Sequence, residues 1–237
     1  MNKCRRMVTE VSLGLVEHGV ATIVPDLYGT GDSGGDFSDG DLSTWQNDLA
    51  TAASWAADAG APVSGLLAVR FGCALAAAAA SAGLLGAVQR TVFWQPSFEG
   101  RRVLSQFLRL RVAAGLMEDR QETIAVLRQR LTGGEIIEVA GYGLSGQLAA
   151  EVEALAPPQR LASELGHVSW YEIVRESEAE RPMRGSAVID RSRLAGREIA
   201  IRGFHGEPFW ASTEIVRNAA MVSETISTFR LWHRDGR

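Results

Sequence analysis

The sequence predicts an α/β fold with a mostly parallel sheet flanked by helices, and three observations lead to this fold class. Short apolar or β-branched runs alternate with segments that carry apolar residues at helical spacing. Strands that alternate with helices pair in parallel through right-handed crossovers. An apolar run over residues 66–69 stops at Arg70-Phe71-Gly72 and passes directly into an alanine-rich segment over residues 73–82, which predicts a buried strand, a sharp turn and a helix. At 237 residues the chain is long enough for a single domain with a full core.

The elements are predicted in order from the N-terminus. Residues 1–19 carry Met7, Val11 and Leu15 at helical spacing and end at a glycine, and residues 20–24 form a short β-branched strand. The Gly/Asp-rich loop that follows this strand is typical of the carboxyl edge of a parallel sheet, where α/β proteins bind ligands. The later elements are helices over residues 41–60, 101–117, 122–131, 144–155 and 212–231, and strands over residues 88–96, 135–140, 167–174 and 197–203.

The composition is ordinary for a globular protein and excludes several partners. Hydrophobic residues make up 46% of the chain, charged residues make up 22%, and the net charge is −4. This charge gives no general attraction to nucleic acid or to an anionic membrane, so neither is expected as a partner. The most apolar run, over residues 66–82, contains Arg70 and breaks at Gly72, so no membrane span is predicted. Residues 1–19 lack the continuous apolar region of a signal peptide.

The two cysteines, Cys4 and Cys73, are too few for a disulfide framework. The chain has no Cys-x-x-Cys motif and no His/Cys cluster, so neither a metal nor another cofactor is expected. We therefore expect two reduced thiols in a cytoplasmic protein. The sequence does not predict the oligomeric state.

Two short motifs in the Gly/Asp-rich loop resemble those of known enzyme classes, but the surrounding sequence argues against both classes. Residues 31–35 reproduce the string around the nucleophile of chymotrypsin-like proteases, which need a histidine and an aspartate upstream, but only His18 precedes the string and it lies in a predicted helix. Residues 29–34 satisfy the dinucleotide-binding pattern, but that pattern must open a helix and residues 36–40 continue as a loop. The loop is therefore predicted to shape a cleft.

The turn after residues 66–69 has the form of a nucleophile elbow. In the elbow pattern G-x-S-x-G the middle residue is the nucleophile, held between a strand and a helix. Here the middle residue is Arg70. Arginine stays protonated and offers no lone pair, so Arg70 acts neither as nucleophile nor as general base. The sequence therefore predicts an enzyme scaffold without its usual reacting atom.

The order of the elements looks like an α/β-hydrolase. Five stretches resemble the exosortase A system-associated hydrolase 2 family, a set of predicted bacterial hydrolases found with exopolysaccharide biosynthesis and exosortase systems. They are Met1-Asn2-Lys3 with Arg5-Arg6-Met7, Asp26-Leu27-Tyr28-Gly29 with Gly31-Asp32-Ser33, Trp94-Gln95-Pro96, Gln106-Phe107-Leu108-Arg109-Leu110-Arg111, and Gly206-Glu207-Pro208-Phe209-Trp210. The resemblance implies an arginine at the elbow, a helical cap inserted over about residues 100–160 of a single domain, and a small-molecule or an acyl- or glycan-linked substrate.

The chain departs from the α/β-hydrolase order at its start. In that fold three strands precede the first helix, and the loop after the third strand donates an N–H to the oxyanion hole. This sequence begins at the helix. We therefore expect Met1 to be an internal methionine or the sequence to be a fragment, with a strand missing between residues 20–24 and 66–69 and a poorly stable chain as the result.

Arg70 at the start of a helix faces the positive end of the helix dipole, which an anion would offset. In one interpretation Arg70, with the N–H groups of Phe71 and Gly72, binds a phosphate or carboxylate of a ligand. In the other, an internal acid such as Asp26 or Glu207 pairs with Arg70. The sequence leaves both open.

The resemblance also suggests catalytic candidates. His205 follows the strand over residues 197–203, where α/β-hydrolases place the histidine of the triad, and Glu176 and Glu178 follow the preceding strand at the position of the acid. His205 is equally a loop histidine without a role, and the two glutamates are equally a solvated charge run. Ser33 and Ser97, at carboxyl strand ends, are candidates to replace the nucleophile. Two functions follow: a hydrolase of an ester, thioester or acyl group linked to exopolysaccharide and exosortase systems, or a non-catalytic protein that binds an anionic ligand at Arg70.

Overall fold

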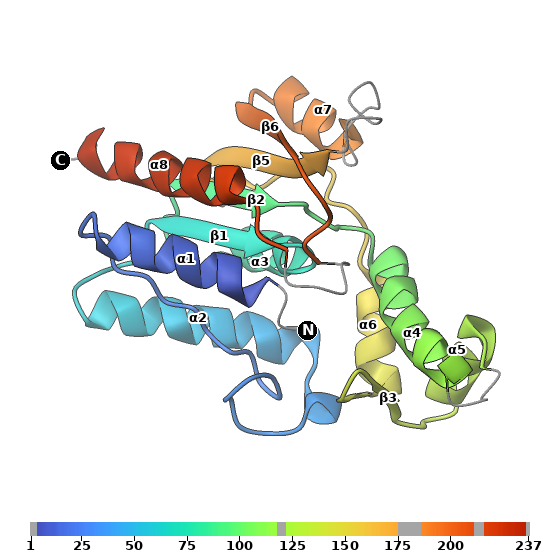
Figure 1. Cartoon of the computed structure of the whole chain (residues 1–237). Helices are drawn as coiled ribbons and strands as arrows, with labels where there is room; N and C mark the ends of the chain where they lie inside the picture. The colour runs from blue at the N-terminus through green and yellow to red at the C-terminus, as the bar shows by residue number, and fades with distance from the viewer. Residues whose placement is uncertain (1–3, 118–121, 175–185, 211–215, 236–237) are drawn as a thin grey trace.

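A computed structural model describes residues 4–117, 122–174, 186–210 and 216–235, and it has the predicted α/β class. Four strands form one parallel sheet in the order β1-β2-β5-β6: β1 (Gly65–Val69), β2 (Arg90–Trp94), β5 (His167–Val174) and β6 (Ile199–His205). Figure 1 shows helices on both faces of this sheet. The strand ends that carry the elbow point toward a separate group of helices beside the sheet.

The two faces of the sheet are covered by different helices because side chains alternate along each strand. Trp94 and Tyr171 face α1 (Arg5–Val16) and α8 (Ala219–Asp235), which also contact each other. Phe93 and Trp170 face α3 (Gly72–Ser81) and α7 (Ser186–Leu194). The helix α2 (Leu42–Asp58) packs against α3 from outside. Each of the two cores therefore contains aromatic residues of the central strands.

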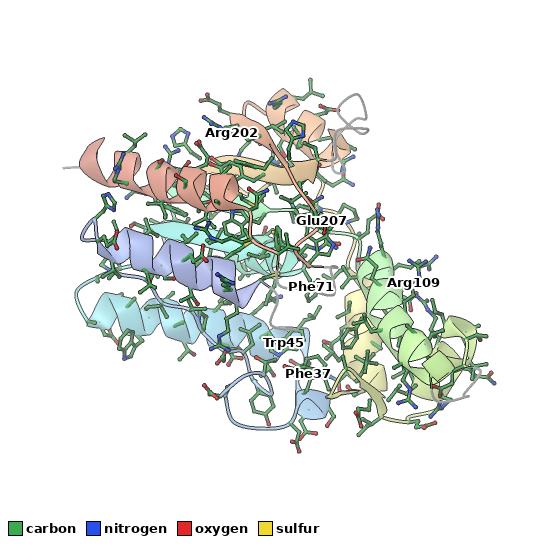
Figure 2. All side chains as sticks on the ribbon, viewed as in Figure 1. Phe37, Trp45, Phe71, Arg109, Arg202 and Glu207 are labelled. Carbon is green, nitrogen blue, oxygen red and sulfur yellow. The ribbon has the colours of Figure 1, made fainter. Side chains whose placement is uncertain are left out.

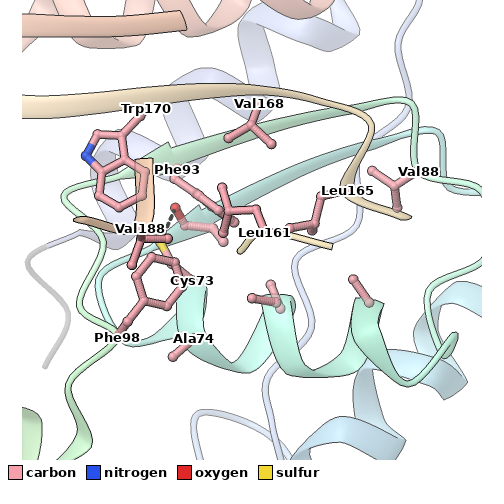
Figure 3. Packing of buried hydrophobic residues seen from close by; sticks show 14 of the residues in the cluster. Cys73, Ala74, Val88, Phe93, Phe98, Leu161, Leu165, Val168, Trp170 and Val188 are labelled. Carbon is pink, nitrogen blue, oxygen red and sulfur yellow. Dashed lines mark hydrogen bonds between the residues drawn. The ribbon is translucent and has the colours of Figure 1, made fainter. Parts of the chain in front are cut away.

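The alanine-rich helix α3 lies close to the sheet because its side chains are small. Seven of its ten residues are buried. Figure 3 shows this face, with Cys73 between Trp170 and Phe98 and with Ala74 next to it on α3. Close packing of this kind fixes the start of α3, and with it the elbow, against the ends of β1 and β2.

Residues 100–154, which we call the helical insert, lie between β2 and β5 in the chain. They form α4 (Gly100–Met117), α5 (Ile124–Thr132), the antiparallel hairpin of β3 (Ile137–Val139) and β4 (Tyr142–Leu144), and α6 (Gly146–Ala154). The insert packs around a core in which Leu108 and Leu127 are fully buried, and it shares this core with Leu42 and Trp45 of α2 and Leu75 of α3. At Gly100 a Cβ atom would lie only 1.7 Å from the carbonyl oxygen of Val152, so glycine is required where α4 crosses α6.

The strand predicted over residues 20–24 is wrong. These residues follow α1 without regular structure, and residues 21–25 are exposed. A β-branched run becomes a strand only where a neighbouring strand accepts its hydrogen bonds, and in the described part of the chain β1 pairs with β2 alone. Residues 20–24 therefore do not pair with β1.

Other differences are smaller. The strand predicted over residues 135–140 is shorter, and β4, which pairs with it, is not predicted. The helix α7 and the short 3-10 helices Phe37–Asp39 and Ser163–Leu165 are also not predicted, and the closing helix begins at Ala219. Among the helices in the described ranges, none has the length and the apolar character needed to cross a bilayer.

Candidate functional site

The predicted elbow has the expected strand-turn-helix geometry. Arg70 follows β1 with φ +56°, a left-handed conformation, and Phe71 returns to the helical region just before α3. A non-glycine residue in this conformation costs about 1–2 kcal/mol, so the surroundings must impose it. The Arg70 N–H donates to the Trp94 carbonyl at 2.9 Å, and the Arg70 carbonyl accepts from Cys73 and Ser97 N–H groups, both at 3.2 Å.

The neighbouring strand β2 ends in the same way. Gln95 has φ +44° and is buried. Its N–H donates to the carbonyl of Tyr171, and its Oε1 accepts the N–H of Ile173, both at 2.7 Å. These two bonds tie Gln95 to β5 and leave its own carbonyl facing Arg70.

Three separate parts of the chain hold the guanidinium of Arg70. Nη1 donates to the Gln95 carbonyl at 3.1 Å, and Nη2 donates to Oε1 of Gln106 on α4 at 3.1 Å. The indole ring of Trp210, in the loop after β6, lies 4.6 Å from the guanidinium carbon, within the range of a cation–π interaction. These contacts hold the guanidinium between the sheet and the helical insert.

The two acids considered as partners of Arg70 are placed differently. Asp26 accepts hydrogen bonds from Arg5 at 3.4 Å and from the N–H of Asp32 at 3.1 Å, so it joins the start of α1 to the Gly/Asp-rich loop. Glu207 is exposed in the loop after β6. Figure 2 shows Phe71 and Glu207 between the sheet and α4.

The candidate catalytic residues are only partly brought together. Ser97 is half-buried, and the hydrogen bond from its N–H to the Arg70 carbonyl places it beside the elbow. Ser33 closes a turn with Thr30 in the loop after α1. His205 is exposed as the last residue of β6, and its carbonyl accepts from Asn218 at 3.1 Å. Glu176 and Glu178 lie outside the described residues.

Three residues at or near this site are not predicted from the sequence. Gln106 and Trp210 lie in stretches that carry the family resemblance, but only the fold brings them to Arg70. The third is Glu172, buried near the carboxyl end of β5, whose Oε1 accepts from Trp170 Nε1 at 2.8 Å. The available signal for Glu172 was that it is the single acid of a predicted strand, because a buried carboxylate requires partners.

Neither cysteine is activated. Burial raises the pKa of the Cys73 thiol, whose Sγ donates to the carbonyl of Ala68 at 3.2 Å. Burial also raises the pKa of Cys4, against the opposing effect of the Arg70 charge. Both thiols therefore remain protonated near neutral pH. Within the described residues, no group of three or more His, Cys, Asp or Glu side chains is arranged to hold a metal ion.

A polar hollow of about 480 Å³ lies between the Gly/Asp-rich loop and the β3–β4 hairpin of the insert. The ring of Phe37 meets the ring of Tyr142 edge-on at 5.0 Å across this junction. The hollow is lined by Gly29, Gly31, Gly35, Asp36, Phe37, Ser38, Gly141, Tyr142 and Gly143. The loop thus helps to shape a cleft, as its composition predicts.

Comparison with known proteins defines the class of fold. No protein-family model and no curated protein matches the chain, so the exosortase-associated family is not confirmed. Among solved structures, the chain is similar to Est1E from Butyrivibrio proteoclasticus with bound ferulic acid, with a TM-score of 0.61 and 16% identity over 95% of this chain and 82% of that one.

Two further structures are similar. One is the alpha/beta hydrolase domain-containing protein 10 from mouse, with a TM-score of 0.59 and 15% identity over 98% of this chain and 84% of that one. The other comes from work on the metagenome-derived lipolytic enzymes LipS and LipT, with a TM-score of 0.54 and 13% identity over 96% of this chain and 88% of that one. The chain therefore has the α/β-hydrolase fold.

Proposed function

We propose that the protein hydrolyses an ester, thioester or acyl bond at the elbow, as a single domain whose helical insert acts as a cap. The observation that carries this proposal is the geometry of Arg70, a cation held at a left-handed strand–helix turn above the N-terminus of α3. Structures similar to this chain include an esterase named with bound ferulic acid and lipolytic enzymes. The family resemblance adds an acyl- or glycan-linked substrate and a link to exopolysaccharide and exosortase systems, and the two thiols favour a cytoplasmic location.

In this proposal Arg70 stabilises charge and does not attack. When a nucleophile adds to the carbonyl carbon, the carbonyl oxygen becomes negative, and the guanidinium with the N–H groups of Phe71 and Gly72 stabilises that oxygen. The nucleophile is the Ser97 hydroxyl or a water molecule, and its proton passes to His205. The leaving alcohol or thiol then takes up this proton from His205 as the carbon–oxygen or carbon–sulfur bond breaks. With water as the nucleophile this step releases the acid; with Ser97 it leaves an acyl group on the serine oxygen, and a water molecule that gives its proton to His205 then attacks this ester, releases the acid and restores the hydroxyl. Glu176 and Glu178 remain candidates to orient His205.

A second function, binding of an anionic ligand without turnover, is favoured by one specific observation. The elbow carries no hydroxyl, and the nearest thiol on α3, that of Cys73, is buried with a raised pKa. Arg70 would then bind a carboxylate or phosphate together with the N–H groups of Phe71 and Gly72. Asp26, which holds the Gly/Asp-rich loop through the N–H of Asp32, is the further candidate for this binding function.

Turnover assays separate the two functions. The wild-type protein is assayed with p-nitrophenyl butyrate and with a butyryl thioester, with and without a serine-directed fluorophosphonate. We expect turnover that falls at least tenfold in Arg70→Ala and His205→Ala but not in Arg160→Ala, an exposed arginine on another surface. Labelling that disappears in Ser97→Ala identifies Ser97 as the nucleophile, and turnover without labelling identifies water. No turnover with either substrate favours the binding function.

A further inference from the structure

The helix α4 presents one face to the elbow, and the contact with Arg70 identifies that face. Oε1 of Gln106 accepts from Arg70, so the side chain of Gln106 points toward the elbow. Residues four before and three after a helical position lie on the same face. In α4 these positions are occupied by Arg102 and Arg109. Two arginines therefore lie one turn on either side of the residue that contacts the elbow, and Figure 2 shows Arg109 on α4.

Arg102 and Arg109 differ from the other arginines of the insert. Arg101 and Arg128 pair with Glu153, and Arg111 and Arg130 pair with Glu122. Arg102 and Arg109 are exposed, and in the described part of the chain neither side chain forms a hydrogen bond or an ion pair. The acids of the insert thus neutralise the arginines that stabilise it and leave these two available.

Arg102 and Arg109 add two positive charges to the face of α4 that contacts the elbow. The helix α4 itself carries no acidic residue to neutralise them. Along the axis of α4, Arg102 and Arg109 are about 10 Å apart, from a rise of 1.5 Å per residue. Two arginine side chains with this separation are long enough to reach one anionic group placed between them. The planar guanidinium of each matches a phosphate in bidentate geometry.

We infer that Arg102 and Arg109 form a phosphate-binding subsite beside the elbow, and that the substrate is an ester whose alcohol part carries a phosphate a few bonds from the ester oxygen. The acyl part of this inference rests on the proposed function; the phosphate subsite does not. The short distance from α4 to the elbow, set by the Gln106–Arg70 contact, selects a phosphate close to the ester over one at the end of a long arm.

A pair of esters that differ only in the phosphate tests the inference. The probes are 1-butyrylglycerol and 1-butyrylglycerol 3-phosphate, and the variants are the double variant Arg102→Gln/Arg109→Gln and the control Arg160→Gln. For wild type and control we expect a KM at least tenfold lower for the phosphate-bearing ester. In the double variant we expect the two KM values to come within threefold. Equal KM values in the wild type would overturn the subsite.

Binding of the product glycerol 3-phosphate, followed by calorimetry, tests the subsite without turnover. We expect the double variant to bind at least tenfold more weakly than wild type and control, with the difference reduced at high salt because the side chains are exposed. If the protein hydrolyses neither ester but its binding of glycerol 3-phosphate depends on the two arginines, the phosphate subsite is supported and the hydrolase function is rejected. Equal binding by wild type and double variant rejects the subsite. A third measurement with lysophosphatidate vesicles identifies the source: tenfold tighter binding than to glycerol 3-phosphate assigns the phosphate to a lipid headgroup, and equal binding assigns it to a soluble metabolite.

Discussion

The backbone at Arg70 gives a quantitative test of the elbow. In Arg70→Ala the left-handed conformation remains but the side chain is lost. Two hydrogen bonds from a charged group contribute about 1.5 kcal/mol each, and the contact with Trp210 contributes about 1 kcal/mol. Removing a cation from a helix N-terminus returns about 0.5–1 kcal/mol. We therefore expect Arg70→Ala to lower the free energy of unfolding by about 3 kcal/mol.

Arg70→Gly should differ from Arg70→Ala by the backbone strain that is relieved, less the greater conformational entropy that glycine loses on folding. Glycine adopts φ +56° without the penalty of about 1–2 kcal/mol that a Cβ atom brings, and its entropy costs about 0.5–1 kcal/mol, so Arg70→Gly is expected to be about 0.5–1 kcal/mol more stable than Arg70→Ala. Ala78→Gly, in the middle of α3, is the matched control, where glycine should be about 1 kcal/mol less stable than alanine. Urea unfolding of the four proteins gives the differences. If Arg70→Gly is no more stable than Arg70→Ala, the elbow does not impose the left-handed conformation and the argument fails.

Three further predictions follow from other parts of the structure. Arg70→Ser alone should not create an esterase, because the surrounding groups are arranged around a cation; a tenfold rise in ester turnover that His205→Ala abolishes would contradict this. Gly100→Ala should lower the unfolding midpoint in urea markedly, since its Cβ would lie 1.7 Å from a backbone oxygen of α6, whereas Gly34→Ala, with no atom within 4 Å, should lower it much less; similar midpoints would remove the steric argument. Hydrogen bonds from Arg111, which has the larger effect, and from Arg130 lower the pKa of Glu122 below its ordinary value of 4.5. The ionised carboxylate therefore stabilises the fold above pH 4.5, and this stabilisation is lost as the pH falls below that value. Glu122→Gln should therefore reduce the loss of stability between pH 6 and pH 3, as measured by urea titration, and an unchanged profile would contradict the assignment.

Local pattern was sufficient for the central features of the fold. The apolar run over residues 66–69, the turn and the alanine-rich helix are adjacent in the chain, so the sequence alone determined the elbow and the absence of a nucleophile at Arg70. The alternation of strands and helices determined the parallel sheet for the same reason. The β-branched residues 20–24 show the limit of this reasoning, because strand formation needs a partner strand and the propensity of a segment does not supply one.

The surroundings of Arg70 depended on the tertiary structure. Gln95 follows β2, Gln106 lies in α4, and Trp210 lies in the loop after β6. No spacing in the sequence relates these three residues to one another. Glu172 became a buried carboxylate only because its strand lies inside the sheet. Helical periodicity placed Gln106 and its two flanking arginines on one face of α4, but only packing of the insert against the sheet turned that face toward the elbow. The sequence therefore determined which groups the protein carries, and the contacts between distant segments decided which of them form a site.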